Sequence, residues 1–238
     1  MKKGYVWILL GILCLLAALG IVAYNRIDDE RAGNASGEVL VKLKDVVREE
    51  REHEPIPVGD SGGSPSSSSA ADLPSEPASS GKASDPYDTP EVILPDYVVD
   101  PGMEMPETEI DGRRYIGVLS IPSLDLELPV QSGWDYKKLK ISPCRYVGTP
   151  YLGNFVIASH NYDRHFGRLK QLSPHDAVFF TDMNGNLFSY EVAEVLILPP
   201  NAVGEMKSGE YPLTLFTCTI GGRTRVTVRC REMTERSK

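Results

Sequence analysis

An uncharged apolar run near the amino terminus constrains this chain more than any other feature. After Lys2 and Lys3, residues 4–25 read GYVWILLGILCLLAALGIVAYN and contain no charged side chain. About 20 such residues in one helix cross the hydrocarbon core of a bilayer. Basic residues precede the run and acidic residues follow it, which predicts a cytoplasmic amino terminus and an extracellular remainder. A cleaved signal peptide is the alternative, because LAALG offers small residues, but the run is longer than a usual signal core. We therefore expect a single-pass cell-membrane anchor over residues 1–25.

The charge of the chain is unevenly distributed. The net charge is −8, yet residues 25–112 carry 21 acidic and 7 basic side chains, whereas residues 113–238 carry 12 acidic and 16 basic ones. A mildly basic domain on an acidic segment would be attracted to an anionic membrane face or to an anionic lipid-linked substrate. This modest charge, on a domain outside the membrane, argues against nucleic acid as a partner.

Residues 26–104 read as an extracellular acidic linker. Val39, Leu43, Val46 and Val47 recur at helical spacing, which predicts a short amphipathic helix. The sequence that follows, PIPVGDSGGSPSSSSAADLPSEPASSGKASDP, is too rich in Ser, Pro and Gly to bury a core. We expect it to be disordered and to act as a spacer that sets how far the next domain reaches from the membrane.

Residues 105–238 predict one mostly β domain with short helices. Segments such as RRYIGVLSIP, LELPVQSG and NFVIASHN are short, rich in β-formers and bounded by Pro and Gly. Asn184–Gly185 lies between two further β-rich runs, which is a strong hairpin signal. Seven or eight short strands with little helix favour a closed or nearly closed barrel.

Three residue types that support nucleophilic catalysis stand at the ends of these predicted strands. Cys218 ends an apolar strand, a strand dense in arginine follows it, and His160 ends another apolar strand. A thiolate is the nucleophilic form of cysteine, a nearby cation stabilises it, and histidine is the commonest general acid and base. Taken singly, each residue has a bland interpretation: a packed thiol, a satisfied histidine, or arginines on a solvated face. Their coincidence at strand ends favours a catalytic site.

The same residues resemble a known family. TLFTC at residues 214–218, followed by RVTVR at residues 225–229, resembles the signature of the sortases, membrane-anchored cysteine transpeptidases of mainly Gram-positive bacteria. GVLSIPSLDLELPV, FVIASHN and FGRLKQL also resemble sortase segments and occur in the same order. The resemblance covers about residues 115–232 and implies a sortase-like barrel. It does not indicate a subclass.

The resemblance also implies roles for individual residues. Cys218 matches the nucleophile that forms a thioester with an LPxTG-like sorting signal, and His160 matches the histidine that exchanges protons with the leaving and incoming amines. Arg225 matches the arginine that positions the substrate and stabilises the oxyanion, although Arg223 is close enough to be an alternative. Thr217 is a candidate substrate-binding residue. The implied partners are a sorting-signal peptide and an acceptor amine such as a peptidoglycan precursor, with no cofactor and no metal.

Two other functions stay open at this stage. A cysteine peptidase that mainly hydrolyses is one, although papain-like families place Cys before His in the chain and here His160 precedes Cys218. A non-catalytic barrel that binds a wall polymer is the other. TDMNGN superficially resembles the start of a calcium loop, but the Asn-Gly turn explains it. Finally, Cys144 and Cys230 could form a disulfide, and DPY at residues 85–87 or LPDY at residues 94–97 could act as a lid.

Overall fold

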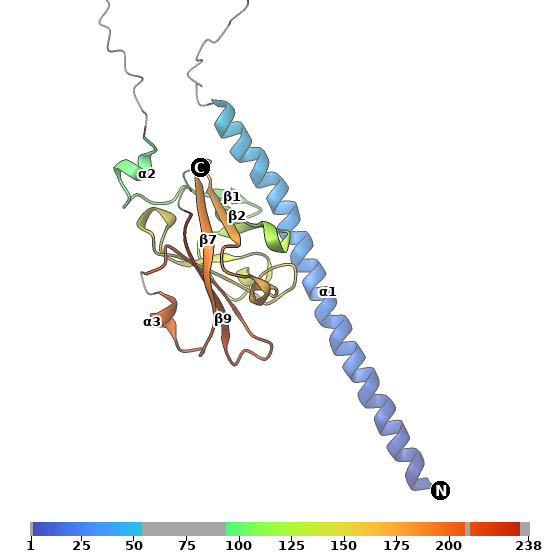
Figure 1. Cartoon of the computed structure of the whole chain (residues 1–238). Coiled ribbons are helices and arrows are strands. Elements are labelled where there is room, and N and C mark those ends of the chain that lie inside the picture. Colours follow the sequence, from blue (N-terminus) through green and yellow to red (C-terminus); the bar gives the residue numbers. More distant parts are fainter. Residues whose placement is uncertain (1, 54–93, 208–209, 234–238) are drawn as a thin grey trace, which may run out of the picture.

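The computed structural model describes residues 2–53, 94–207 and 210–233, and shows one β domain beside a long helix (Figure 1). The strands are β1 (Thr108–Ile110), β2 (Arg113–Ile121), β3 (Leu126–Gln131), β4 (Cys144–Val147), β5 (Phe155–Ser159), β6 (Ala177–Asp182), β7 (Leu187–Leu198), β8 (Leu213–Cys218) and β9 (Arg225–Glu232). The helices are α1 (Lys2–His53), α2 (Asp96–Val99) and α3 (Val203–Met206), with 3-10 turns η1 (Pro122–Leu124), η2 (Lys138–Lys140), η3 (Pro150–Leu152) and η4 (Leu169–Gln171).

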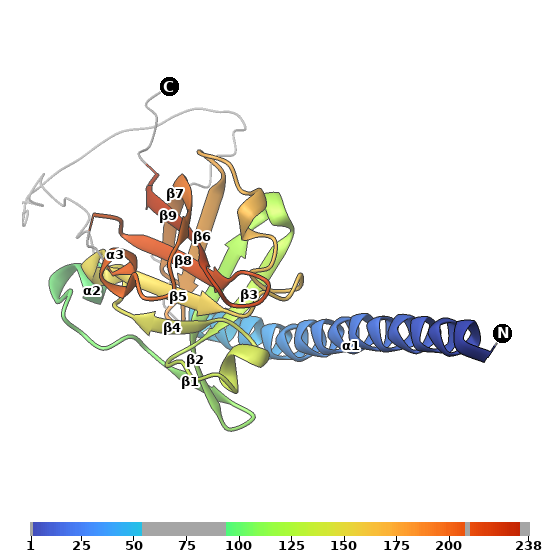
Figure 2. The ribbon, with the colours of Figure 1, turned by 90° about the horizontal axis from the view of Figure 1, so that it is seen from below.

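Eight of these strands close into a barrel, which confirms the predicted fold class (Figure 2). The order is β2-β3-β4-β5-β8-β9-β7-β6, and β6 pairs with β2 to complete the ring, while β1 extends the sheet beside β2. Gly117 stands where the ring closes. Its φ is +151°, and a Cβ there would collide with the carbonyl oxygen of Thr181 in β6. Only glycine allows the two backbones to approach this closely.

Alternation along the strands separates an apolar interior from an outer face. The barrel interior is one cluster of buried side chains drawn from most strands, including Phe155, Ile157, Leu213 and Leu215. Neighbouring residues in β5 and β8 point outward, and there Ala158 and Phe216 join a second, smaller cluster. Outward-facing positions at the ends of these two strands are therefore available for a surface site.

α1 is a single helix of 52 residues that joins the apolar run to the predicted amphipathic helix. Ala32, Ser36, Val39 and Leu43 are buried at helical spacing, which confirms the predicted apolar face. Its partner is the barrel, because Val39 and Leu43 pack with Ile110, Tyr115 and Met183. The expected boundary at residue 25 thus falls within one continuous helix.

This docking bears on the predicted role of the Ser/Pro-rich segment. The disorder expected there, and the candidate lid at residues 85–87, fall on residues 54–93, which lie outside the described residues. A spacer sets the distance between two bodies only when nothing else joins them. Because α1 itself contacts β1 and β3, the helix holds the barrel at a set height above the apolar run. The spacer role of the Ser/Pro-rich segment stays a prediction.

The predicted hairpin at Asn184–Gly185 is confirmed between β6 and β7, with Gly185 at φ +80°. The carboxylate of Asp182 accepts hydrogen bonds from the Tyr151 hydroxyl at 2.7 Å and from the backbone N–H of Asn186 at 2.9 Å. The carboxylate that begins the calcium-like sequence therefore closes the turn and ties it to η3.

The remaining structural expectations concern cysteines and the second lid candidate. Cys144 and Cys230 are both free and buried, and they belong to different clusters, Cys144 outside the barrel wall and Cys230 inside it. The suggested disulfide is therefore not formed.

Tyr97 of α2, in the second lid candidate, stacks on Tyr151, with ring centroids 5.0 Å apart. Tyr151 precedes β5, whereas His160 follows it, so this lid candidate lies at the opposite end of the strand from the predicted site.

Candidate active site

A cleft lies on the outer face of the barrel where β5, β8 and β9 run side by side. Ala158, Phe216, Cys218 and Arg225 belong to these three strands and form its floor. The residues that line the rest of the cleft are Trp134, Tyr136, Leu139, Tyr146, Ser159, Pro200, Val203 and Met206. Most of this lining is aromatic or apolar, so the cleft suits an extended peptide with apolar side chains.

Cys218 is the last residue of β8 and its side chain is half-buried on the floor of the cleft. Its direction follows from the period of two along the strand, because Leu213 and Leu215 point into the barrel and Phe216 points out. The two other cysteines of the barrel are fully buried, and burial raises the pKa of each thiol to about 12. Cys218 is the barrel thiol that a substrate can reach.

His160 follows β5 directly, one residue beyond the last paired residue of that strand. β5 and β8 are parallel neighbours, and their register pairs Ser159 with Thr217. The next residue along each strand is His160 and Cys218, and neighbouring strands are about 4.8 Å apart. Burial, and secondarily the charge of Lys140, lower the pKa of His160 below its usual value. The imidazole is therefore mainly neutral at pH 7, as a proton acceptor for a thiol should be.

Arg225 begins β9 directly opposite Cys218 in the antiparallel β8–β9 pair. Cross-strand partners share a face of the sheet, so the guanidinium shares the cleft with the thiol. Nη1 donates to the carbonyl oxygens of Gly222 and Thr224, each at 3.1 Å. These bonds hold the side chain at the β8–β9 loop.

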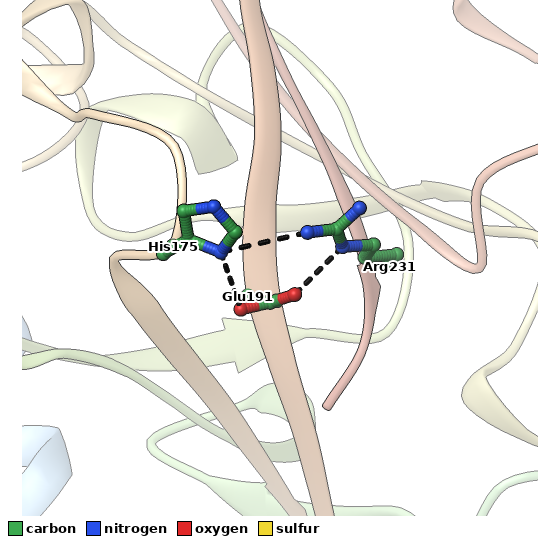
Figure 3. Close-up of polar contacts among 3 residues, drawn as sticks. All are labelled: His175, Glu191 and Arg231. Carbon is green, nitrogen blue, oxygen red and sulfur yellow. Dashed lines mark hydrogen bonds and ion pairs between the residues drawn. The ribbon is translucent and has the colours of Figure 1, made fainter. Parts of the chain in front are cut away.

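The other arginines of this segment are engaged elsewhere. Arg229 donates to Glu194 at 3.0 Å, and Arg231 donates to Glu191 at 2.6 Å. Glu191 also binds the ring of His175, and these two partners lower the pKa of its carboxyl (Figure 3). Among the salt bridges of the described residues, none involves Arg225. The acidic side chains of β7 thus take the outer arginines and leave Arg225 to the cleft.

Thr217 does not face the cleft. It is 2% exposed, and its hydroxyl donates to the carbonyl oxygen of Ser159 at 2.9 Å. This bond ties β8 to β5 one residue before Cys218 and His160. We propose that Thr217 positions those two residues and that the cleft lining, rather than Thr217, contacts the substrate.

Sequence reasoning missed two parts of this site. Trp134 and Tyr146 form one wall of the cleft with ring centroids 5.3 Å apart, and only the aromatic content of their loop and strand hinted at them. The loop after His160 is held by α1: the backbone N–H of Arg164 donates to Asp29 at 3.0 Å, and the Ser36 hydroxyl contacts the His165 ring at 3.2 Å. No local pattern links these distant segments.

Comparison with known proteins finds similarity to one family. The sortase domain family matches residues 119–233, a range that includes His160, Cys218 and Arg225. This part of the chain is therefore similar to the sortases. Over 121 residues it is 29% identical to sortase A of Bacillus anthracis, a match that covers 48% of this chain and 57% of that protein. The chain thus spans little more than half the length of this relative.

Sortases are also found among solved structures similar to this one. Sortase C1 of Streptococcus agalactiae is 25% identical with a TM-score of 0.47, covering 54% of this chain and 72% of that one. A lid mutant of sortase A from Corynebacterium diphtheriae is 24% identical with a TM-score of 0.43, covering 52% of this chain and 73% of that one.

Proposed function

We propose that this chain is a cysteine transpeptidase that cleaves an LPxTG-like sorting signal and transfers the acyl group at the new carboxyl end of the amino-terminal fragment to an amine. The observation that supports this most is that Cys218, His160 and Arg225 stand at the ends of three adjacent strands, with Cys218 and Arg225 lining the cleft. The sortase match of the domain adds to it. The same arrangement serves no purpose in a barrel that only binds a polymer.

The first half-reaction forms a thioester. The neutral ring of His160 takes the proton of the Cys218 thiol, and the sulfur adds to the scissile carbonyl carbon. The carbon–nitrogen bond then breaks, His160 returns the proton to the leaving amine, and the acyl group stays on sulfur. Negative charge develops on the carbonyl oxygen during the attack. The guanidinium of Arg225 stands on the same face and is able to stabilise that oxygen.

The second half-reaction releases the product. An acceptor amine attacks the thioester, His160 takes the surplus proton from the new amide nitrogen, and the sulfur leaves as a thiolate that regains a proton from His160. Water in place of the amine gives hydrolysis, the reaction of a peptidase. The apolar lining of the cleft, which includes Trp134, Tyr146, Val203 and Met206, suits the Leu-Pro part of the sorting signal.

The apolar part of α1 supports membrane anchoring. It is long and apolar enough to cross a bilayer, and in the described residues its side chains are exposed rather than packed. We propose that residues 4–24 span the membrane, that Lys2 and Lys3 lie on the cytoplasmic side, and that the barrel is extracellular. An acidic linker and a catalytic domain over residues 105–238 complete the proposed organisation.

A peptide library tests the enzymatic proposal. The chain from residue 26 onward is incubated with fluorogenic LPxTG-type peptides, with and without a small amine, and products are identified by mass. We expect an amide product that requires the amine. Cys218→Ala should abolish turnover, and Arg225→Ala should lower kcat/KM on the order of 100-fold, about 3 kcal/mol. Arg231→Ala is the matched control, because this arginine is held by Glu191 outside the cleft. Turnover that survives in Cys218→Ala contradicts the mechanism, and products of water alone indicate a peptidase.

A further inference from the structure

A polar cavity lies between α1 and the two loops that follow His160 and Cys218. Its α1 side consists of Asn25, Arg26, Asp28, Asp29 and Glu30, and its barrel side consists of Asn161, Tyr162, Asp163, Arg164, Ile220 and Gly221. The loop after His160 and the loop after Cys218 therefore lie at the same height along α1. That height is the first turn and a half beyond the apolar run.

The barrel is held at this height by contacts along about four turns of α1, from Asp29 to Leu43. Asp29 accepts from the backbone of Arg164, and the Ser36 hydroxyl donates to the carbonyl oxygen of Ile141 at 2.6 Å. Further along, Lys42 pairs with Asp111 at 2.8 Å. Val39 and Leu43 add apolar packing on the same face. Contacts spread over this length fix both the height and the rotation of the barrel relative to the helix.

The position of the bilayer edge follows from helix geometry. A membrane span of about 20 residues, at 1.5 Å per residue, equals the hydrocarbon thickness of about 30 Å, so the outer edge lies close to residue 24. Residues 25–30 then occupy the next 9 Å or so. The headgroup layer on each side is about 5–8 Å thick. The active-site loops that share the cavity with residues 25–30 therefore stand in or directly above the headgroup layer.

The β8–β9 loop, Thr219–Thr224, has the surface that such a position requires. Ile220 is 93% exposed, more than any other large apolar side chain among the described residues. Gly221 and Gly222, at φ +82° and +71°, form the turn, and Arg223 is exposed beside them. The base of the loop is fixed, since Thr219 and Thr224 join through both backbone and side chain, the hydroxyls being 2.9 Å apart. A fixed turn that presents one apolar and one cationic side chain suits a lipid surface.

We propose that the β8–β9 loop rests on the bilayer, with Ile220 in the interfacial layer and Arg223 among the lipid phosphates. Figure 1 shows this end of β9 on the side of the barrel that faces the amino-terminal half of α1. The inference rests on the membrane anchoring proposed above. It places the opening of the Cys218 cleft at the membrane surface, within reach of an amine carried on a lipid.

A depth measurement tests this contact without using enzymatic activity. Ile220→Cys is made in the full chain carrying Cys14→Ser and Cys218→Ala, since the other two cysteines are buried. The thiol is labelled with an environment-sensitive fluorophore and the chain is inserted into vesicles of equimolar phosphatidylcholine and phosphatidylglycerol. Spin-labelled lipids with shallow acyl labels then quench probes at the interface. We expect blue-shifted emission and strong quenching.

Leu187→Cys is the matched control, because Leu187 is also exposed, at 58%, but lies far from the loop. It starts β7, whereas Leu198, which pairs with Arg225, stands at the other end of that strand. Its probe should be quenched several-fold less. Quenching of Trp7 fluorescence, measured in the unlabelled full chain carrying Trp134→Phe so that Trp7 is the single tryptophan, reports insertion of α1 itself. A probe at 220 that is no more quenched than the probe at 187, with Trp7 quenched, overturns the loop contact and leaves the anchor intact. Failure to quench Trp7 overturns both.

Discussion

Acid should loosen the packing between α1 and the barrel through one buried histidine. His165 is 0% exposed, and its ring lies against the Ser36 hydroxyl of α1. Burial lowers the pKa of His165 to about 4, against 6.5 in the unfolded chain. Between these two values the unfolded state binds more protons than the folded state, so the free energy of unfolding falls as the pH falls. This loss of stability is nearly complete at about pH 4 and is absent well above pH 6.5.

The magnitude follows from the two pKa values. Between pH 7 and pH 5 the loss from His165 is about 2 kcal/mol, and down to pH 4 it approaches about 3 kcal/mol. The window from 7 to 5 is the informative one, because most carboxyl groups titrate below it. His165→Gln cannot take up a proton, so it should remove this part of the pH dependence while keeping a group that hydrogen-bonds Ser36.

Urea unfolding of residues 26–238 measures this difference. Trp134 is then the single tryptophan and reports unfolding by its fluorescence. The midpoints of the original sequence and of His165→Gln are compared at pH 7 and pH 5. We expect the variant to lose about 2 kcal/mol less over this interval. An equal loss in both proteins refutes the reasoning, since it means that the buried ring is protonated as easily as a free one. Hydrogen exchange in residues 32–43 shows whether α1 separates before the barrel unfolds.

Three further predictions follow from the same structure. Leu43→Ala should lower the free energy of unfolding by about 2–5 kcal/mol because Leu43 is 0% exposed, whereas Val41→Ala, at 64% exposure, should stay within about 0.5 kcal/mol in the same urea assay. The value of kcat/KM should rise with pH to a plateau as His160 loses its proton, and the midpoint of this rise should lie below pH 6.5. A midpoint above pH 6.5 argues that the imidazole of the free enzyme is not buried as described. Gly117→Ala should open the β2–β6 pair and cost more than about 3 kcal/mol, and amide exchange that stays slow in β6 would contradict that account.

Much of the barrel could be predicted because its information is local. Short runs of β-formers gave the strands, Asn184–Gly185 gave a hairpin, and the residues at strand ends gave the candidates for the site. The alternation of side chains along β8 could also have predicted the orientation of Thr217. If Cys218 faces a cleft on the outside of the barrel, then Thr217 must face inward, as it does.

The docking of α1 could not be predicted, because its information is not local. The buried face of the helix was readable from Val39 and Leu43. Its partners Ile110, Tyr115 and Met183 come from β1, β2 and the turn after β6, which share a surface only after the barrel closes. The Ser/Pro-rich sequence between the two suggested separate bodies. Nothing in a single pattern shows that a helix returns to contact a domain that follows such a segment.

The continuous α1 helix also changes how the chain between residues 54 and 93 should be regarded. Both of its ends attach to the same body, one at the end of α1 and the other just before α2. Closing a loop costs entropy that grows only with the logarithm of its length, about 0.6 kcal/mol for each doubling. Evolution is then free to lengthen, shorten or recompose this stretch with little effect on stability, and a protein engineer can insert a tag or a second domain there without moving the cleft.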